Sequence, residues 1–177
     1  ICLNPHIPET EALGQKATSM LTSKLQQIAT ANGMSGAGFD NRFIITAHIQ
    51  KLKSSQTQTF PQKNAVEISI GIYVGDGLDG TLYSSYNCEE KGIGSSEDQA
   101  IAAAVRKVNP NQEELQRAII KGKEMILKYY DKMSGNIIKT AKATAAAGRY
   151  EDAINMLFAI PMNNKDFQTA QSLIAQY

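Results

Sequence analysis

The sequence is poor in the side chains from which metal and redox sites are built. Its 177 residues include no tryptophan, two cysteines and two histidines. No pair among Cys2, Cys88, His6 and His48 has the spacing of zinc ligands, so we expect no metal site. Two cysteines also exclude a disulfide-dense scaffold. They are either two buried free thiols or, if their strands are neighbours, one disulfide.

Charge of one sign and long hydrophobic runs are also scarce. The net charge is +1, and the sequence has no long run of residues of either charge. This argues against a dedicated nucleic-acid-binding protein, which would have a concentrated basic surface. The uninterrupted apolar runs are only a few residues long, so we expect no transmembrane segment. The sequence begins with Ile1 rather than methionine. Either a leader was removed or the chain was trimmed, and a lipid anchor on such a leader stays open.

What the sequence does contain is a clear β-hairpin and helix between residues 65 and 108. The alternation of apolar residues from Val66 to Val74 predicts a half-buried strand. The glycines and aspartates of Gly75–Gly80 favour a turn, and Thr81–Cys88 returns as a second strand. Ser96–Gln99 forms a capping box before an alanine-rich helix. This unit can bury its apolar face only against another layer.

Two loops of this unit could carry chemistry, and both have a simpler interpretation. Asp76 and Asp79 could bind calcium, but a calcium loop needs more oxygen ligands and a distal glutamate. A hairpin turn is favoured there. Gly92–Ser96 could hold an anion, but it lacks the lysine of a phosphate-binding loop. Helix capping is favoured there.

The remaining pattern predicts a strand, a helix and a strand before the hairpin, and helices after it. The expected elements are a strand at Ile1–Leu3, a helix at Thr10–Ala31, a strand at Arg42–Leu52, a mobile loop at Lys53–Asn64, a helix at Pro110–Lys132, a break at Ser134–Gly135, and helices at Asn136–Ala147, Tyr150–Ala159 and Asp166–Tyr177. Strands grouped between helices indicate an α+β fold, with a small, mostly antiparallel sheet packed by helices. We predict a sheet domain over 1–133 and an all-α helical-hairpin tail over 134–177.

The order of elements in residues 1 to about 108 resembles the amino-terminal domain of TolB and the related domain of CsgG-like envelope lipoproteins. The resemblance rests on the first helix, the strand that begins at Arg42, the strand that ends at Gly80, and Gly92–Ser96 before an alanine-rich helix. It implies a bacterial envelope component that binds other proteins and has no catalytic residues. It also implies a location in the periplasm or at the outer membrane.

Gly148–Ile154 resembles the turn of a tetratricopeptide repeat. Gly148 permits a tight turn, Tyr150 fills the gap between helices, and Ala141 and Ala153 let the helices approach closely. The resemblance implies a helix pair that binds proteins. An ordinary helical hairpin is the alternative.

Together these patterns predict a non-catalytic module for protein interaction or assembly, because no nucleophile, base or metal spacing is present. We expect no cofactor. Contacts are expected along an exposed sheet edge such as Arg42–Leu52, or on the tail helices near Tyr150. The candidate partner-binding residues are Tyr73, Tyr83, Tyr86, Arg149 and Tyr150. The alternative function is binding of a small ligand or carbohydrate on the tyrosine-rich sheet face.

Overall fold

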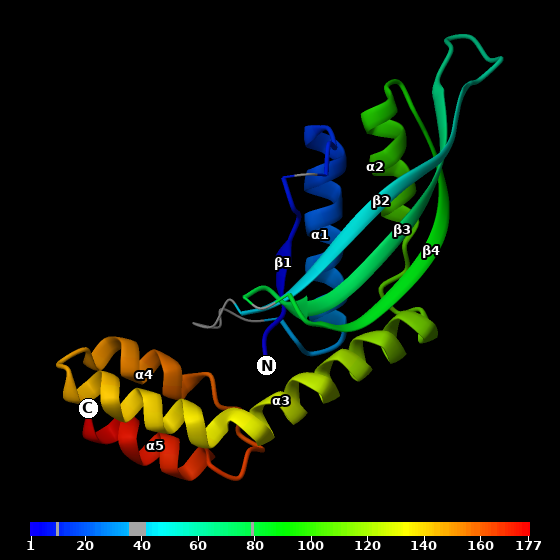
Figure 1. The fold of residues 1–177 in the computed structure, drawn as a ribbon. Coiled ribbons are helices and arrows are strands. Elements are labelled where there is room, and N and C mark those ends of the chain that lie inside the picture. The colour runs from blue at the N-terminus through cyan, green and yellow to red at the C-terminus, as the bar shows by residue number, and fades with distance from the viewer. Residues whose placement is uncertain (10, 36–41, 79) are drawn as a thin grey trace.

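The chain folds into a four-stranded sheet, a layer of helices and a helical tail (Figure 1). The structure, a computed structural model, describes residues 1–9, 11–35, 42–78 and 80–177. Its elements are β1 (Asn4–His6), α1 (Gln15–Ala31), β2 (Phe43–Gln56), β3 (Asn64–Asp76), β4 (Leu82–Gly94), α2 (Glu97–Lys107), α3 (Glu113–Ala146), α4 (Tyr150–Phe158) and α5 (Phe167–Gln176). The predicted α+β fold is confirmed.

The sheet has the order β1-β2-β3-β4, in which β1 is parallel to β2 and the other pairs are antiparallel. β2 is therefore an interior strand where it begins, and the prediction that it forms an exposed edge is wrong there. β1 covers it only at Ile44–Thr46. The predicted loop at Lys53–Asn64 is shorter than expected, because β2 continues to Gln56 and pairs with β3.

The first strand lies three residues later than predicted. Leu3 is a core residue with 2% of its surface exposed, and the strand begins at Asn4. Pro5 lies within the strand because β1 is an edge, where half of the backbone N–H groups need no partner. The shift places Leu3 over the core rather than at the end of the sheet.

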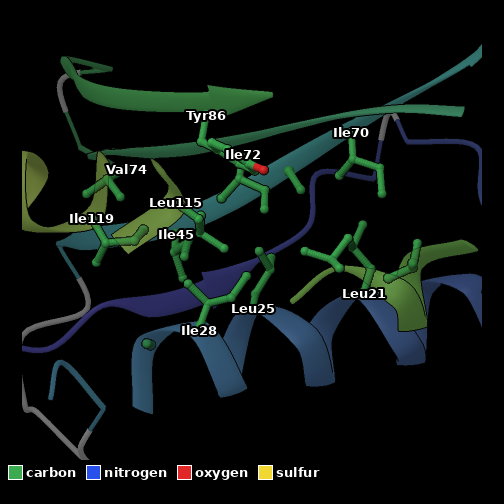
Figure 2. Close-up of a cluster of buried hydrophobic side chains, with 14 of the residues drawn as sticks. Leu21, Leu25, Ile28, Ile45, Ile70, Ile72, Val74, Tyr86, Leu115 and Ile119 are labelled. Atoms are coloured by element: carbon green, nitrogen blue, oxygen red, sulfur yellow. The ribbon is translucent and has the colours of Figure 1, made fainter. Parts of the chain in front are cut away.

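The main core lies between one face of the sheet and the helices α1, α2 and α3. Figure 2 shows Leu21, Leu25 and Ile28 of α1 facing the apolar residues of the sheet. The alternation predicted for β3 is confirmed, because Val66, Ile68, Ile70, Ile72 and Val74 are all buried. Leu115 and Ile119 of α3 close the same core.

α1 and α2 cap each other across the helix layer. The carboxylate of Asp98 accepts hydrogen bonds from the backbone N–H groups of Lys16 (3.1 Å) and Ala17 (2.9 Å) at the start of α1. The ammonium of Lys24 donates to the carbonyl of Arg106 (3.0 Å) in the last turn of α2. Each helix thus satisfies terminal backbone groups of the other, with a charge of the sign that the helix dipole favours.

Two helices begin later than predicted. α1 begins at Gln15, and Thr10 lies outside the described residues. α3 begins at Glu113, because the Asn109 side chain accepts from the N–H of Asn111 (3.0 Å) and holds a turn. The capping box is half confirmed. The Ser96 hydroxyl accepts from the Gln99 N–H (3.2 Å), but the Gln99 side chain bonds the Ser95 hydroxyl (2.5 Å).

The predicted break at Ser134–Gly135 is wrong, because α3 is one helix of 34 residues. A glycine inside a helix costs only about 1 kcal/mol relative to alanine, too little to end a long helix. Nevertheless, the described buried apolar residues form two clusters. The first cluster ends on α3 at Tyr130, and the second begins at Ile138. The division into 1–133 and 134–177 stays a prediction, since one helix serves both parts.

The tail is a helical hairpin of α3 and α4 with α5 beside it. Gly148 takes the positive φ of 81° that the turn requires. Ala141 and Ala153 are fully buried, as expected for helices that approach closely. Tyr150 does not fill the gap between the helices. It is 52% exposed, and its ring lies 6.1 Å from that of Tyr177.

Candidate functional site

The strongest candidate site lies where the end of the sheet meets the middle of α3. Arg42 precedes β2, and its Nε donates to Oδ2 of Asp76 at 2.5 Å. The Asp76 side chain is fully buried, and its other oxygen accepts from the Leu78 N–H (2.9 Å). This geometry supports the hairpin-turn interpretation, because the Asp76 carboxylate accepts hydrogen bonds from the turn backbone and from Arg42. Asp79 lies outside the described residues.

Aromatic rings surround this ion pair. The Phe43 ring lies 5.7–6.0 Å from the rings of Tyr83, Tyr129 and Tyr130. The Arg42 guanidinium lies 4.5 Å from the centre of the Tyr129 ring. It is thus held between a carboxylate and an aromatic face, which fixes the start of β2 against α3.

A polar network fixes the α4–α5 connection to the same part of α3. The Ser134 hydroxyl donates to Asp166 (2.5 Å), and the Asn164 side chain donates to Asp131 (3.1 Å). Ser134 is fully buried and Asn164 is 7% exposed. Buried polar groups that find partners specify one arrangement of the chain. The network therefore sets the position of the tail on α3.

Two cavities open between the sheet and the tail. One, of about 370 Å³, is lined by Arg42, Leu78, Tyr129 and Met156, among others. The other, of about 310 Å³, is lined by Phe158, Met162 and Phe167, among others, and both include Tyr130 and Ala159. Leu78 and Met162 are each 77% exposed, and Phe158 is 51% exposed. We call Leu78, Tyr129, Met156, Phe158 and Met162 the junction surface.

The candidate tyrosines do not form one patch. Tyr73 lies on the sheet face that none of the described helices covers, where a Cβ placed on Gly71 would collide with its ring. Tyr83 packs against Phe43, and Tyr86 is buried on the helix-covered face, where its hydroxyl donates to Gln112 (2.8 Å). Only Tyr83 therefore lies next to the junction surface.

The tail candidates Arg149 and Tyr150 are exposed at the turn between α3 and α4. Arg149 lies 3.6 Å from the Asp152 carboxylate, one turn along α4. An exposed ion pair of this kind contributes little to stability. Both side chains remain candidates for partner contact at the far end of the tail.

The cysteines and histidines lie apart. Cys2 and Cys88 are free thiols near opposite edges of the sheet, so the disulfide alternative is wrong. His48 is exposed and contacts the Glu11 carboxylate. Within the described residues, no three of the side chains that commonly bind metals are grouped as a site. The described helices also include none with the length and hydrophobicity needed to cross a bilayer.

Burial perturbs two groups in β4. It raises the pKa of Tyr86 to about 12, with smaller effects from Cys88, Glu114 and Glu90. Burial also raises the pKa of the Cys88 thiol, and the charge of Glu90 adds to this effect. Both groups are therefore held in their neutral forms, which suits packing rather than nucleophilic chemistry.

The sequence patterns did not indicate most of the junction surface. They assigned no binding role to Tyr129, Phe158 or Met162. The available signal was the adjacent pair Tyr129–Tyr130, because two neighbouring helix positions face different directions. One ring had to lie away from the helix's own buried stripe.

Comparison with known proteins gives weak likenesses. No family model matches the sequence, and no curated protein matches it. A minor lipoprotein from Acinetobacter baumannii has 12% identity and a TM-score of 0.43, over 67% of this chain and 93% of its own. A candidate lipoprotein from Caulobacter crescentus CB15 has 12% identity and a TM-score of 0.35, over 76% of this chain and 91% of its own.

Proposed function

We propose that the protein is a non-catalytic module of the bacterial cell envelope that binds a partner protein through the junction surface. The observation that carries the proposal is the exposure of Leu78, Phe158 and Met162 beside two cavities. Large apolar side chains that gather at a concave surface are typical of protein contact sites. The resemblance to TolB-like and CsgG-like domains supports a periplasmic or outer-membrane-associated location.

The geometry favours a pre-formed binding surface over a flexible one. Arg42 is fixed by Asp76 and by the Tyr129 ring, and the network at Ser134 fixes the tail. A surface whose walls are held in this way loses little conformational entropy on binding. The two walls come from the sheet domain and from the tail, so a partner would contact both.

Site-directed photo-crosslinking in cells tests the proposal. A crosslinking residue placed at Phe158 or Met162 is expected to capture a defined envelope protein. The same residue at Ser85, which is exposed on the uncovered sheet face, serves as the matched control. Equal capture at all three positions, or none at the first two, would contradict the proposal. Fractionation of the same cells tests the envelope location.

A second candidate function is glycan binding on the uncovered sheet face. The Tyr73 side chain lies over Gly71, next to the Asn87 amide. A flat ring beside a side-chain amide can stack on a sugar and bond its hydroxyl groups. On a glycan array, Tyr73→Ala is expected to lose binding while Tyr150→Ala retains it. Binding that survives Tyr73→Ala would remove this candidate.

A further inference from the structure

The outer surfaces of α1 and α2 form a groove away from the junction surface. It has a volume of about 750 Å³. Its walls carry small side chains, namely Ser19 and Ser23 of α1 and Ala102 and Ala103 of α2. The two helices lie side by side on the same face of the sheet (Figure 1). Small side chains on both walls would let the backbone of a third helix approach closely.

The groove also has apolar lining. Met20 lies between the two serines of α1, and Ile93 reaches the groove from the end of β4. Ile93 is 58% exposed, and with Met20 it gives the groove an apolar surface that an occupant could cover. An occupant therefore needs apolar side chains on the face that it turns to the groove.

The charged side chains that line the groove are both cations, Lys16 and Arg106. Neither forms an ion pair within the part of the chain that the structure describes. The nearby carboxylate of Asp98 is already used by the N–H groups of α1. The groove is therefore complementary to a negatively charged occupant.

The positions of the two cations set the spacing of the charges in the occupant. Lys16 lies at the level of Asp98, which bonds its backbone N–H, and Arg106 follows Asp98 by eight residues on α2. At 1.5 Å per residue this separation is about 12 Å along the groove. Carboxylates seven residues apart on a helix are two turns, or about 11 Å, apart on one face.

We propose that this groove binds an acidic amphipathic helix of a partner protein, with carboxylates seven residues apart and apolar side chains between them. One carboxylate pairs with Lys16 and the other with Arg106, while the intervening side chains contact Met20 and Ile93. This site is separate from the junction surface, so it can fail without affecting the proposed function. It would give the protein a second contact site, one that selects an acidic helix.

Amide chemical-shift mapping on the full chain tests the proposal. The probe is a synthetic alanine-based helical peptide with two glutamates seven residues apart and leucines between them. We expect saturable shifts in the amides of residues 15–23 and 99–106. Arg106→Gln and Arg106→Glu are expected to weaken binding by about tenfold or more, as loss of a close charge pair does.

Lys107→Glu is the matched control, because it makes the same kind of charge change on α2 outside the groove lining. A second peptide with its glutamates four residues apart tests the spacing. The proposal is overturned if no shifts saturate at millimolar peptide, or if they map elsewhere. It is also overturned if Lys107→Glu weakens binding as much as Arg106→Glu, or if both peptides bind equally. A thermal melt of each variant checks that the fold is retained.

Discussion

The sheet domain and the helical tail bury different kinds of side chain. The main core is dominated by leucine, isoleucine and valine from strands and helices far apart in the sequence. In the tail cluster, alanine supplies four of the seven buried residues described: Ala141, Ala145, Ala153 and Ala170. Large side chains bury much apolar area, whereas alanines let helices approach but bury little. We therefore expect the core between the sheet and the helices to contribute more to stability than the cluster among α3, α4 and α5.

The largest effect that this difference predicts is at Ile70. Its side chain is fully buried at the centre of the sheet. We expect Ile70→Ala to lower the free energy of unfolding by about 3–4 kcal/mol, because it removes packing and leaves a cavity. Urea denaturation measures this loss, with Ser85→Ala on the uncovered face as the control. A loss below about 1 kcal/mol would mean that the core is not close-packed.

The tail should respond to added volume instead. Ala141 is fully buried where α3 meets α4. We expect Ala141→Leu to destabilise the tail by about 1–3 kcal/mol, because the helices must separate. Hydrogen exchange should show faster exchange in α4 and α5 and no change in β3. The exposed neighbour Lys142→Leu is the control. Equal effects of both variants would show that α3 and α4 are not closely packed.

A third test compares a tyrosine of the main core with a tyrosine of the tail by their effect on the pH dependence of stability. The pKa of Tyr86 is raised to about 12 in the folded chain, whereas the pKa of a tyrosine in an unfolded chain is about 10. Tyr86 holds its proton more tightly in the folded state than in the unfolded state, which favours folding. This contribution to stability is complete below about pH 10 and is lost as the pH rises through about 12. We expect Tyr86→Phe to flatten the stability curve in this range, with Tyr150→Phe as the control. A curve unchanged by Tyr86→Phe would exclude Tyr86 as its cause.

The smallest effect is expected at the point on α3 where the two regions meet. Gly135 lies inside the helix, and a Cβ placed there meets no atom within 4 Å. Gly135→Ala should raise stability by about 0.5–1 kcal/mol, because alanine loses less backbone entropy on forming a helix. The midpoint of thermal unfolding measures this gain. A decrease would indicate that the helix bends or opens at this residue.

The regular elements were predictable from the sequence because their apolar periods are strong. The alternation from Val66 to Val74 required a half-buried strand, and Gly148 required a turn. The hydrogen bond that buries Ser134 in α3 was not predictable, since its partner Asp166 is 32 residues away. The junction surface was hidden for the same reason. Leu78, Tyr129 and Phe158 belong to three separate segments that only the fold brings together.

The continuity of α3 has a consequence for binding two partners at once. A helix of 34 residues is about 51 Å long, and it joins the sheet domain to the tail without a flexible linker. Molecules bound at opposite ends would be held at a set separation and orientation, instead of exploring the volume that a tether allows. Their effective concentration for each other would be high when that geometry suits them and close to zero when it does not.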